Sequence, residues 1–405
     1  MTMAPVSVIV VSRHRAAALM RCIVALTQQD HPNFELIVVA DPEAIRQAEN
    51  LPLPLKCVTF DEANISAARN AGLAMASGPV VAFIDDDAVA EPTWLSRLTA
   101  PFANAQVTAS TGFIRGRNGI SYQWQACEVD QFDQDHPLTI TEPVLRANTP
   151  QRAVKTQGTN CAFRRDALLA IGGFDPAYRF YLDEADVNLR LSGQNLSGLT
   201  AIIPDAQVHH GYLASARRTA NRVPLSLHDI AASTAIFLRR HAPEADFSAA
   251  LKALSLREST RIAEHRRAGR IDVQAELGLL TSLTQGWAEG LAHILAALSP
   301  LPETSAALQP LKTGPRPGKI LAGRFWQKRR LLAEAAASTA HITTVFLFTP
   351  TARPHKISFQ PQGYWLQTGG IFGQSTRHGP RFRLISLRKR VAEEAARLSA
   401  YRPIG

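Results

Sequence analysis

Three consecutive aspartates follow a run of apolar residues in the first quarter of the chain. The apolar run is 80–84, and the carboxylates are Asp85, Asp86 and Asp87. A short run rich in β-branched residues is typical of a buried strand of a parallel sheet. Because burying an unpaired charge is costly, we expect the aspartates to emerge at the carboxyl end of that strand, where open α/β sheets bind ligands. Such a cluster suits Mg²⁺ or Mn²⁺ beside substrate phosphates, although a solvated acidic turn would have the same sequence.

A second acidic cluster opens a helical pattern in the middle of the chain. It contains Asp183, Glu184 and Asp186. Carboxylates in a first helical turn are favoured by the helix dipole and need no catalytic role. A carboxylate can also act as a general base, so both interpretations stand on these residues alone. Asp186 and Arg190 have the i, i+4 spacing of a surface ion pair worth roughly a few tenths of a kcal/mol.

Two adjacent histidines, His209 and His210, follow further along the chain. Neighbouring side chains on an extended strand point to opposite faces, so at most one of the two can enter a site. We expect that residue to be His209. The alternative is a loop pair that binds nothing.

A few residues have side chains that could contact an acceptor sugar. Trp124, Phe132 and Tyr181 offer aromatic faces, which pack well against apolar ring faces. Asn160, in the sequence Gly-Thr-Asn, offers a side-chain amide. Core packing and a simple turn are the structural alternatives for these residues.

Strands and helices alternate over the first hundred residues. This pattern indicates βαβ units, a mostly parallel sheet and an α/β fold. Neither G-x-G-x-x-G nor G-x-x-x-x-G-K-[ST] follows the first strand, so a bound nucleotide would be held through a metal at the aspartates. The expected strands lie at 6–11, 34–39, 55–60 and 80–84, and the expected helices at 19–26, 43–50, 64–76 and 92–102.

The bulk composition limits the class of protein. A chain of 405 residues, 46% of them hydrophobic, can form two or three domains with a sizeable core. It has no run of 18 apolar residues and no visible secretory signal. Its four cysteines form no metal-binding or disulfide pattern, which predicts reduced thiols in a cytoplasmic protein.

Positive charge is concentrated near the C-terminus. Residues 311–405 contain 17 Lys/Arg and 3 Glu, a surplus of 14, whereas the whole chain has a net charge of only +10. A basic tail on a mildly acidic body indicates an anionic partner, most simply an acidic polymer or the surface of a membrane at its inner face. We expect no nucleic acid, because no zinc-finger spacing or RNA-recognition signature is present.

Changes in composition divide the second half of the chain into three segments. We expect a helical extension at 225–298 with helices at 247–267 and 272–298, a proline-rich linker at 299–319, and a basic C-terminal module at 320–405. The catalytic or binding domain would then occupy 1–224. Within the C-terminal module the pattern predicts a helix at 323–340, strands at 343–348, 363–372 and 381–387, and a terminal helix at 388–398.

Taken in order, the motifs resemble family 2 glycosyltransferases, which have the GT-A fold. The resemblance is carried by "VSVIVVSRHR", "FELIVVAD", "ISAARNAG", "VVAFIDDDA", "GGFDPAYRFYLDEADVNLR" and "VHHGYLASARR". These motifs cover roughly residues 5–240. For this chain the resemblance implies nucleotide-sugar contacts from Ser12, Asp41, Arg69, Asp85 and Asp86, metal ligands at Asp87 and His209, a base at Glu184 or Asp183, and acceptor contacts from Trp124 and Asn160.

The chain departs from the family pattern at three places. The loop after the first strand reads Ser-Arg-His-Arg at 12–15, where the family usually has Tyr-Asn-Arg. The second strand ends in Ala40-Asp41-Pro42 rather than a pair of acidic or amide residues. The later acidic motif reads Asp-Glu at 183–184 instead of Glu-Asp, so either residue could be the base.

The resemblance predicts an inverting enzyme that uses Mn²⁺ or Mg²⁺ and transfers a sugar from a nucleotide-sugar donor to an acceptor hydroxyl. The acceptor would be a glycan or a lipid-linked sugar in the synthesis of cell-surface polysaccharide or glycoconjugate. Two other functions remain possible on the residues. One is a sugar nucleotidyltransferase, against which the absence of glycines at 12–15 counts. The other is a non-catalytic module that binds nucleotide or glycan.

Overall fold

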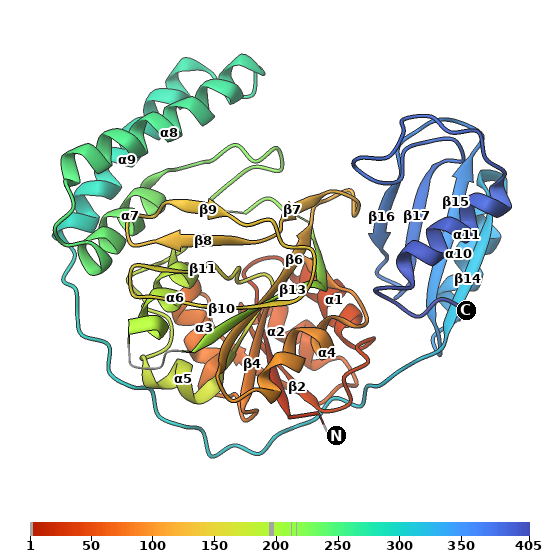
Figure 1. Ribbon diagram of the computed structural model, residues 1–405, viewed down its shortest axis with the longest axis horizontal. Helices are drawn as coiled ribbons and strands as arrows, with labels where there is room; N and C mark the ends of the chain where they lie inside the picture. The colour runs from red at the N-terminus through yellow and green to blue at the C-terminus, as the bar shows by residue number, and fades with distance from the viewer. Residues whose placement is uncertain (1–2, 194–197, 212, 216) are drawn as a thin grey trace.

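The computed structural model describes residues 3–193, 198–211, 213–215 and 217–405. Its centre is a ten-stranded mixed sheet with the order β10-β13-β6-β12-β4-β1-β2-β3, to which β5 and β7 add at β13 and β6 (Figure 1). The predicted α/β fold with a mostly parallel first half is confirmed. The strands are β1 (Val6–Val11), β2 (Phe34–Ala40), β3 (Leu55–Thr59), β4 (Val80–Asp85), β5 (Ala88–Ala90), β6 (Val107–Arg115), β7 (Tyr122–Trp124), β10 (Val144–Ala147), β12 (Cys161–Arg164) and β13 (Leu199–His210).

Helices cover both faces of this sheet because its central strands are apolar on both sides. Val8 and Val10 of β1 pack with one layer, made of α1 (Ala16–Leu26), α2 (Pro42–Glu49) and α4 (Trp94–Thr99). Ile9, between them, packs with the other layer. That layer consists of α3 (Ile65–Leu73), α5 (Arg165–Ala170) and α6 (Asp183–Gly193). The helix predicted at 92–102 ends at Thr99, and a 3₁₀ turn (Ala100–Ala103) containing Pro101 follows.

Parallel pairing of β1 with β4 positions the acidic cluster. The register places Val11 opposite Asp85. The loops that follow these two residues therefore leave the sheet at the same edge. This edge brings the basic loop 12–15 to the three aspartates, although about 70 residues separate them in the chain.

A small three-stranded sheet and three helices extend the main body. The sheet has the order β11-β8-β9. Helices α8 and α9 form an antiparallel pair that projects from the body (Figure 1). The helix predicted to reach residue 298 ends at Ala292, and an extended segment with two early prolines follows. The elements are β8 (Cys127–Asp130), β9 (Asp135–Pro137), β11 (Arg152–Val154), α7 (His228–His241), α8 (Phe247–Arg267) and α9 (Val273–Ala292).

An extended segment runs from residue 293 to 317 and crosses the body. The backbone N–H of Leu301 donates to Leu169, and that of Leu311 donates to Phe34. Leu311 is buried in the main core. The proline-rich segment expected at 299–319 is therefore bound to the main domain along its path.

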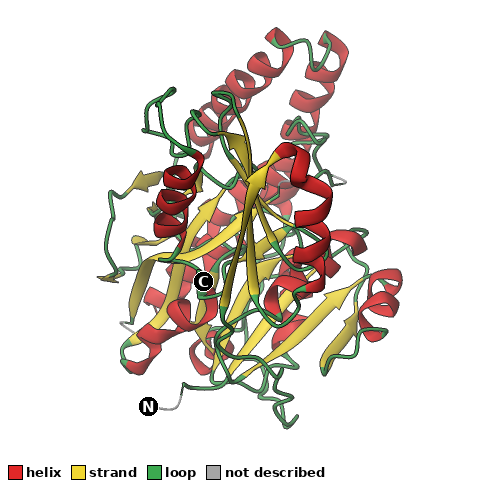
Figure 2. Ribbon diagram, turned by 90° about the vertical axis from the view of Figure 1, so that its right-hand side faces the viewer, coloured by secondary structure: helices red, strands yellow, loops and turns green. Residues whose placement is uncertain are grey.

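The C-terminal residues form a separate four-stranded sheet with the order β14-β15-β17-β16. Figure 2, which looks from the side of this sheet, shows it in front of the larger one. The helix predicted from residue 323 begins only at Lys328, because 318–324 pairs with β15 as a strand. The strand predicted at 381–387 does not form; it makes one isolated bridge, at Phe382. The elements are β14 (Gly318–Arg324), α10 (Lys328–Ala337), β15 (Ile342–Thr349), β16 (Lys356–Phe359), β17 (Trp365–Gly370) and α11 (Leu387–Leu398).

No helix among the described residues is both long enough and apolar enough to cross a lipid bilayer.

Candidate active site

The aspartates lie at the turn between β4 and β5. Asp86 is fully buried and faces the loop after β1, where the Ser12 hydroxyl donates to its Oδ2 at 2.6 Å. The Arg15 Nη2 atom lies 2.5 Å from Asp86 Oδ1, and Arg15 Nη1 lies 3.5 Å from Asp87 Oδ2. Burial raises the pKa of Asp86 to about 7, although Arg15 opposes the rise. Asp86 therefore anchors the first loop and does not face the pocket.

Asp85, Asp87 and His210 form a group that could hold a metal ion. One ligand atom from each lies within 4.8 Å of the others. His210 Nε2 is 3.0 Å from Asp87 Oδ1 and 3.9 Å from Asp85 Oδ2. Burial would raise the pKa of Asp87, but His210 and Arg15 hold it below its ordinary value. Two carboxylates and an imidazole suit a divalent cation such as Mn²⁺, so the residues present fit the cofactor expected from the sequence.

The histidine of this group is not the one expected. His209 Nε2 lies 2.8 Å from Glu91 Oε1, and its ring lies 5.0 Å from the ring of Trp365. Adjacent residues of β13 point to opposite faces, so only one of the pair can reach Asp87. The structure thus brings His210, and not the predicted His209, next to Asp85 and Asp87.

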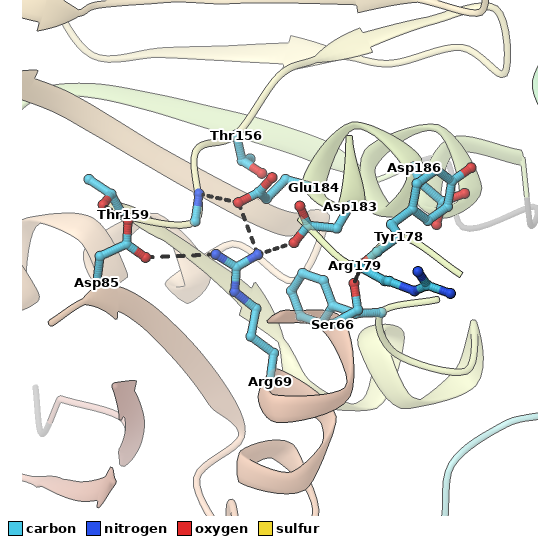
Figure 3. A network of polar contacts seen from close by, with 12 residues as sticks. Ser66, Arg69, Asp85, Thr156, Thr159, Tyr178, Arg179, Asp183, Glu184 and Asp186 are labelled. Atoms are coloured by element: carbon cyan, nitrogen blue, oxygen red, sulfur yellow. Dashed lines mark hydrogen bonds and ion pairs between the residues drawn. The ribbon is translucent and has the colours of Figure 1, made fainter. Parts of the chain in front are cut away.

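Arg69 of α3 joins the metal group to the second acidic cluster (Figure 3). Its Nη2 lies 3.9 Å from Asp85 Oδ1, its Nη1 lies 2.9 Å from Glu184 Oε1, and it also pairs with Asp183. Burial would lower the pKa of Arg69, but these three carboxylates raise it above its ordinary value. Arg69 is thus a permanent cation between the two groups of acids.

The two acids at the start of α6 have different environments. The side chain of Asp183 is 2% exposed, and that of Glu184 is 21% exposed. Burial and the charge of Glu184 raise the pKa of Asp183 well above its ordinary value. Burial opposes ionisation of Glu184, but Arg69 lowers its pKa below the ordinary value. Glu184 is therefore the ionised and accessible member of the pair.

The loop containing Gly158 closes over this pair. The Gly158 N–H donates to Glu184 Oε1 at 2.8 Å. A Cβ at position 158 would overlap the side-chain ends of Arg69 and Glu184, so any residue other than glycine would displace this pair. The next residue, Thr159, donates its hydroxyl to Asp85.

A pocket of about 470 Å³ opens beside these groups. It is rich in basic side chains, including Arg13, Arg15, Arg217 and Arg218, and Phe60 and Phe180 add aromatic surface. Of the residues predicted from the sequence, Ser12, Asp85 and Asp87 line it, together with His210. Its charge and size are suitable for a phosphorylated ligand that carries an aromatic base.

The other predicted residues lie in the framework. Asp41 caps α2 by accepting from Ala44 N at 3.2 Å, and it accepts from His14 N at 2.7 Å, which holds the first loop. Asn160 is fully buried and donates to Phe113 and Ala206 carbonyls.

Trp124, expected at an acceptor site, packs against the main core. Lys155 Nζ lies 5.9 Å from the centre of its ring. Neither Trp124 nor Asn160 lines the pocket beside Asp85. The structure thus gives both residues packing or hydrogen-bonding contacts within the domain.

Arg15, Gly158 and Thr159 make contacts in the site that the sequence analysis did not assign. The sequence pattern could have indicated a contact between Arg15 and the aspartates. Parallel strands of one sheet end at the same edge, so the loop after β1 lies close to the loop after β4 when the two strands are neighbours. For the 158–159 loop the sequence indicated only a Gly-Thr-Asn segment that could contact a sugar or form a simple turn, not its contacts with Glu184 and Asp85. Its contacts depend on the long connection between β6 and β12.

Comparison with known proteins identifies the class of this domain. Residues 7–172 match the family model described as Glycosyl transferase family 2. Residues 7–172 therefore contain a family 2 glycosyltransferase domain. Residues 173–405, which hold Glu184, His210 and the C-terminal sheet, lie outside the matched range.

Curated relatives are similar over part of their length. The glucosyl-dolichyl phosphate glucuronosyltransferase of Haloferax volcanii is 27% identical over 172 residues, which are 40% of this chain and 53% of that protein. The succinoglycan biosynthesis protein ExoM of Rhizobium meliloti is 29% identical over 208 residues, 49% of this chain and 63% of that protein. The chain spans little more than half the length of the first of these relatives.

Among solved structures, the mannosyltransferase PcManGT from Pyrobaculum calidifontis, in complex with GDP-Man and Mn²⁺, is 18% identical. The match covers 71% of this chain and 87% of that chain, with a TM-score of 0.43.

Proposed function

We propose that the protein transfers a sugar from a nucleotide-sugar donor to an acceptor hydroxyl, with a divalent metal and with inversion. The observation that carries this proposal is that Asp85, Asp87 and His210 line a basic pocket and that Arg69 connects Asp85 to Glu184. The group next to β4 is suited to the diphosphate, and the acid of α6 is suited to proton removal.

The basic loops position the donor in this proposal. Arg13 and Arg15 from one side, and Arg217 and Arg218 from the other, supply positive charge for the phosphates. Phe60 offers a flat apolar surface for the base. A bound divalent cation would offset the negative charge that develops on the leaving nucleoside diphosphate.

Glu184 is the base in this proposal. It is ionised, it keeps contact with solvent, and Gly158 and Arg69 fix its Oε1. Burial and the charge of Glu184 raise the pKa of Asp183, and its side chain is only 2% exposed, so it is less accessible to an acceptor hydroxyl. A single positioned base acting in one displacement gives inversion at the sugar carbon.

Thermal unfolding with UDP, GDP and dTDP sugars, each with and without Mn²⁺, tests the proposal. A ligand that binds the folded state raises its melting temperature by mass action. We expect one donor to raise it in a Mn²⁺-dependent manner, and Asp87→Asn to remove that shift. Asp205→Asn, which changes a half-exposed aspartate outside the pocket, is the matched control.

The result also separates the alternatives. A donor-dependent shift without release of nucleoside diphosphate in the presence of acceptors would support a non-catalytic binding module. Release of pyrophosphate from a nucleoside triphosphate and a sugar phosphate would support a nucleotidyltransferase.

We also propose an acceptor that is a glycan or a lipid-linked sugar, and peripheral contact with an anionic membrane at its cytoplasmic face. The names of two relatives refer to a dolichyl phosphate and to succinoglycan biosynthesis. Phe325 and Trp326 are 58% and 69% exposed and lie beside the basic residues Arg324 and Lys328. Exposed aromatic rings next to cations suit an anionic membrane interface.

Co-sedimentation with vesicles of phosphatidylserine and phosphatidylcholine tests this contact. We expect Phe325→Ser with Trp326→Ser to reduce binding, whereas Leu256→Ser, at an exposed leucine of α8, should leave it unchanged. Equal binding by all three proteins would remove this surface from consideration.

A further inference from the structure

A second basic pocket lies between the main domain and the C-terminal sheet. Its volume is about 350 Å³, which is within the range of ligand sites. The main domain contributes Arg115 and Tyr122, and the C-terminal residues contribute Arg377, Arg397 and Tyr401. None of its lining residues belongs to the pocket beside the aspartates.

The strand β7 separates this pocket from the metal group. Gln123, in the middle of β7, places its Oε1 atom 3.0 Å from His210 Nδ1. Tyr122, its neighbour, lines the second pocket. Successive residues of a strand face opposite sides, so a ligand in the second pocket would lie across β7 from the donor.

The charge of this pocket is unbalanced. Its described lining residues include Arg115, Arg377, His378 and Arg397 but no aspartate or glutamate. Among the described residues, the carboxylate that pairs with a lining cation is Glu394, which lies 2.7 Å from Arg397.

Arg115 is the most informative of these cations because it is only 7% exposed. Its three hydrogen bonds go to neutral oxygens: Gln207 Oε1 at 2.6 Å, the Ile120 carbonyl at 2.8 Å and the Tyr122 hydroxyl at 3.1 Å. A buried charge is ordinarily paired with an opposite charge. Burial lowers the pKa of nearby Arg402 and Glu91 opposes this, whereas Arg397 and Arg115, two further cations in this region, lower it further.

We propose that this pocket binds an anionic sugar, that is, a carbohydrate carrying a phosphate or carboxylate group. Guanidinium groups bind both kinds of oxyanion through paired hydrogen bonds. The rings of Tyr122 and Tyr401, whose centres lie 4.5 Å and 5.4 Å from Arg115 Cζ, offer surfaces for the apolar face of the sugar. The pocket is larger than a bare oxyanion requires, and both parts of the chain form its walls.

Isothermal titration calorimetry on the full chain tests this proposal with four probes: glucose 6-phosphate, glucuronate, glucose and inorganic phosphate. We expect at least one anionic sugar to bind one site per chain and glucose to show no binding. Inorganic phosphate should bind more weakly than glucose 6-phosphate, because it lacks the ring that packs on the tyrosines. Higher salt should weaken binding.

Arg377→Ala is the main variant because Arg377 is exposed and its loss does not threaten the fold. We expect it to weaken binding of the anionic sugar by roughly tenfold, as loss of a charge-assisted hydrogen bond does. Arg388→Ala removes the same charge from an exposed position of α11 outside the pocket and should leave affinity unchanged. Equal losses in the two variants would indicate general attraction by the basic module and overturn the proposal.

A second pair of measurements tests whether the anionic sugar binds in the donor pocket instead of the second pocket. Asp87→Asn should keep the affinity for the anionic sugar, and Arg377→Ala should keep the Mn²⁺-dependent shift with the nucleotide sugar. Failure of every anionic probe to bind the folded wild-type protein would overturn this inference without touching the proposed transferase function. Equal affinity for phosphate and glucose 6-phosphate would show that the sugar ring does not contribute to binding, and would contradict the proposal that the ligand is a sugar.

Discussion

Glu184 and Asp183 are adjacent acids whose surroundings shift their pKa values in opposite directions. Arg69 and Gly158 stabilise the anion of Glu184, whereas burial and the charge of Glu184 raise the pKa of Asp183. We expect Glu184→Gln to lower the turnover number by roughly 10²–10⁴-fold, and Asp183→Asn to lower it by less than about tenfold. The measurement is release of nucleoside diphosphate with the donor found by thermal unfolding. A larger loss in Asp183→Asn would assign the base to Asp183.

His31 gives the protein a pH-dependent stability. It is 1% exposed, its Nδ1 accepts from Asn33 N at 3.2 Å, and burial lowers its pKa from 6.5 to about 4. Below pH 6.5, His31 of the unfolded chain therefore binds a proton, whereas His31 of the folded chain stays neutral until the pH approaches 4. This contribution to stability is complete above pH 6.5 and is lost as the pH falls towards 4, with a slope of up to about 1.4 kcal/mol per pH unit.

Urea unfolding of wild type and His31→Gln between pH 7.5 and pH 4.5 tests this contribution. The variant should be less stable at pH 7.5 but should lose less stability than the wild type on acidification. Parallel pH profiles for the two proteins would contradict the assignment to His31.

At the scale of the elements, Asp186 joins α6 to α7. Its carboxylate lies 2.6 Å from Arg190 Nη2 and 2.9 Å from His241 Nε2, and Arg240 Nε is 3.7 Å away. The expectation of a surface pair between Asp186 and Arg190 is wrong, because α7 covers Asp186 completely. These partners lower the pKa of Asp186 to about 2 in spite of its burial.

We expect Asp186→Asn to lower the free energy of unfolding by about 3–5 kcal/mol, because it leaves buried cations without their counterion. Glu43→Gln is the control, since it breaks an exposed pair between Glu43 and Arg46 on α2 and should change stability by less than about 1 kcal/mol. Chemical denaturation measures both. A loss in Asp186→Asn as small as that in the control would show that the helices do not depend on this contact.

At the scale of the whole molecule, the end of the chain is tied into the main domain. Arg402 is fully buried, with its Nε 2.9 Å from Glu91 Oε2 and its Nη2 2.5 Å from Glu91 Oε1. Its guanidinium carbon lies 3.6 Å from the centre of the Trp365 ring, and Glu91 also contacts His209. Apolar residues of both parts, including Ala25 and Val89, share one core cluster with the C-terminal sheet.

We expect Arg402→Met to destabilise the protein by about 3–5 kcal/mol, because Glu91 would remain charged and buried without its cation. The double variant Glu91→Gln/Arg402→Met should recover part of this loss, since it removes both charges together. Denaturant unfolding of the two single variants, the double variant and the wild type gives the coupling free energy. A double variant whose loss equals the sum of the single losses would show that the pair is not coupled.

The sequence by itself determined the local features of this protein. Apolar periodicity, proline and glycine positions and acidic clusters located most strands and helices of the first domain, because these signals depend on neighbouring residues. The same local signals placed the three aspartates at the end of β4 and both acids at the start of α6. They failed where local pattern and pairing disagree, as at the start of the helix expected at 323–340, where β14 of the C-terminal sheet extends to Arg324.

Only the tertiary structure decided how these features meet. The pairing of β13 selected His210 over His209, burial by the 158 loop and α3 distinguished Glu184 from Asp183, and packing turned Asn160 and Trp124 inward. The contact between Arg402 and Glu91 joins residues 311 positions apart, and the second basic pocket combines residues between 115 and 125 with residues between 375 and 401. Such contacts depend on long-range packing and on the free energy of burial, and neither is visible in the spacing of residues along the chain.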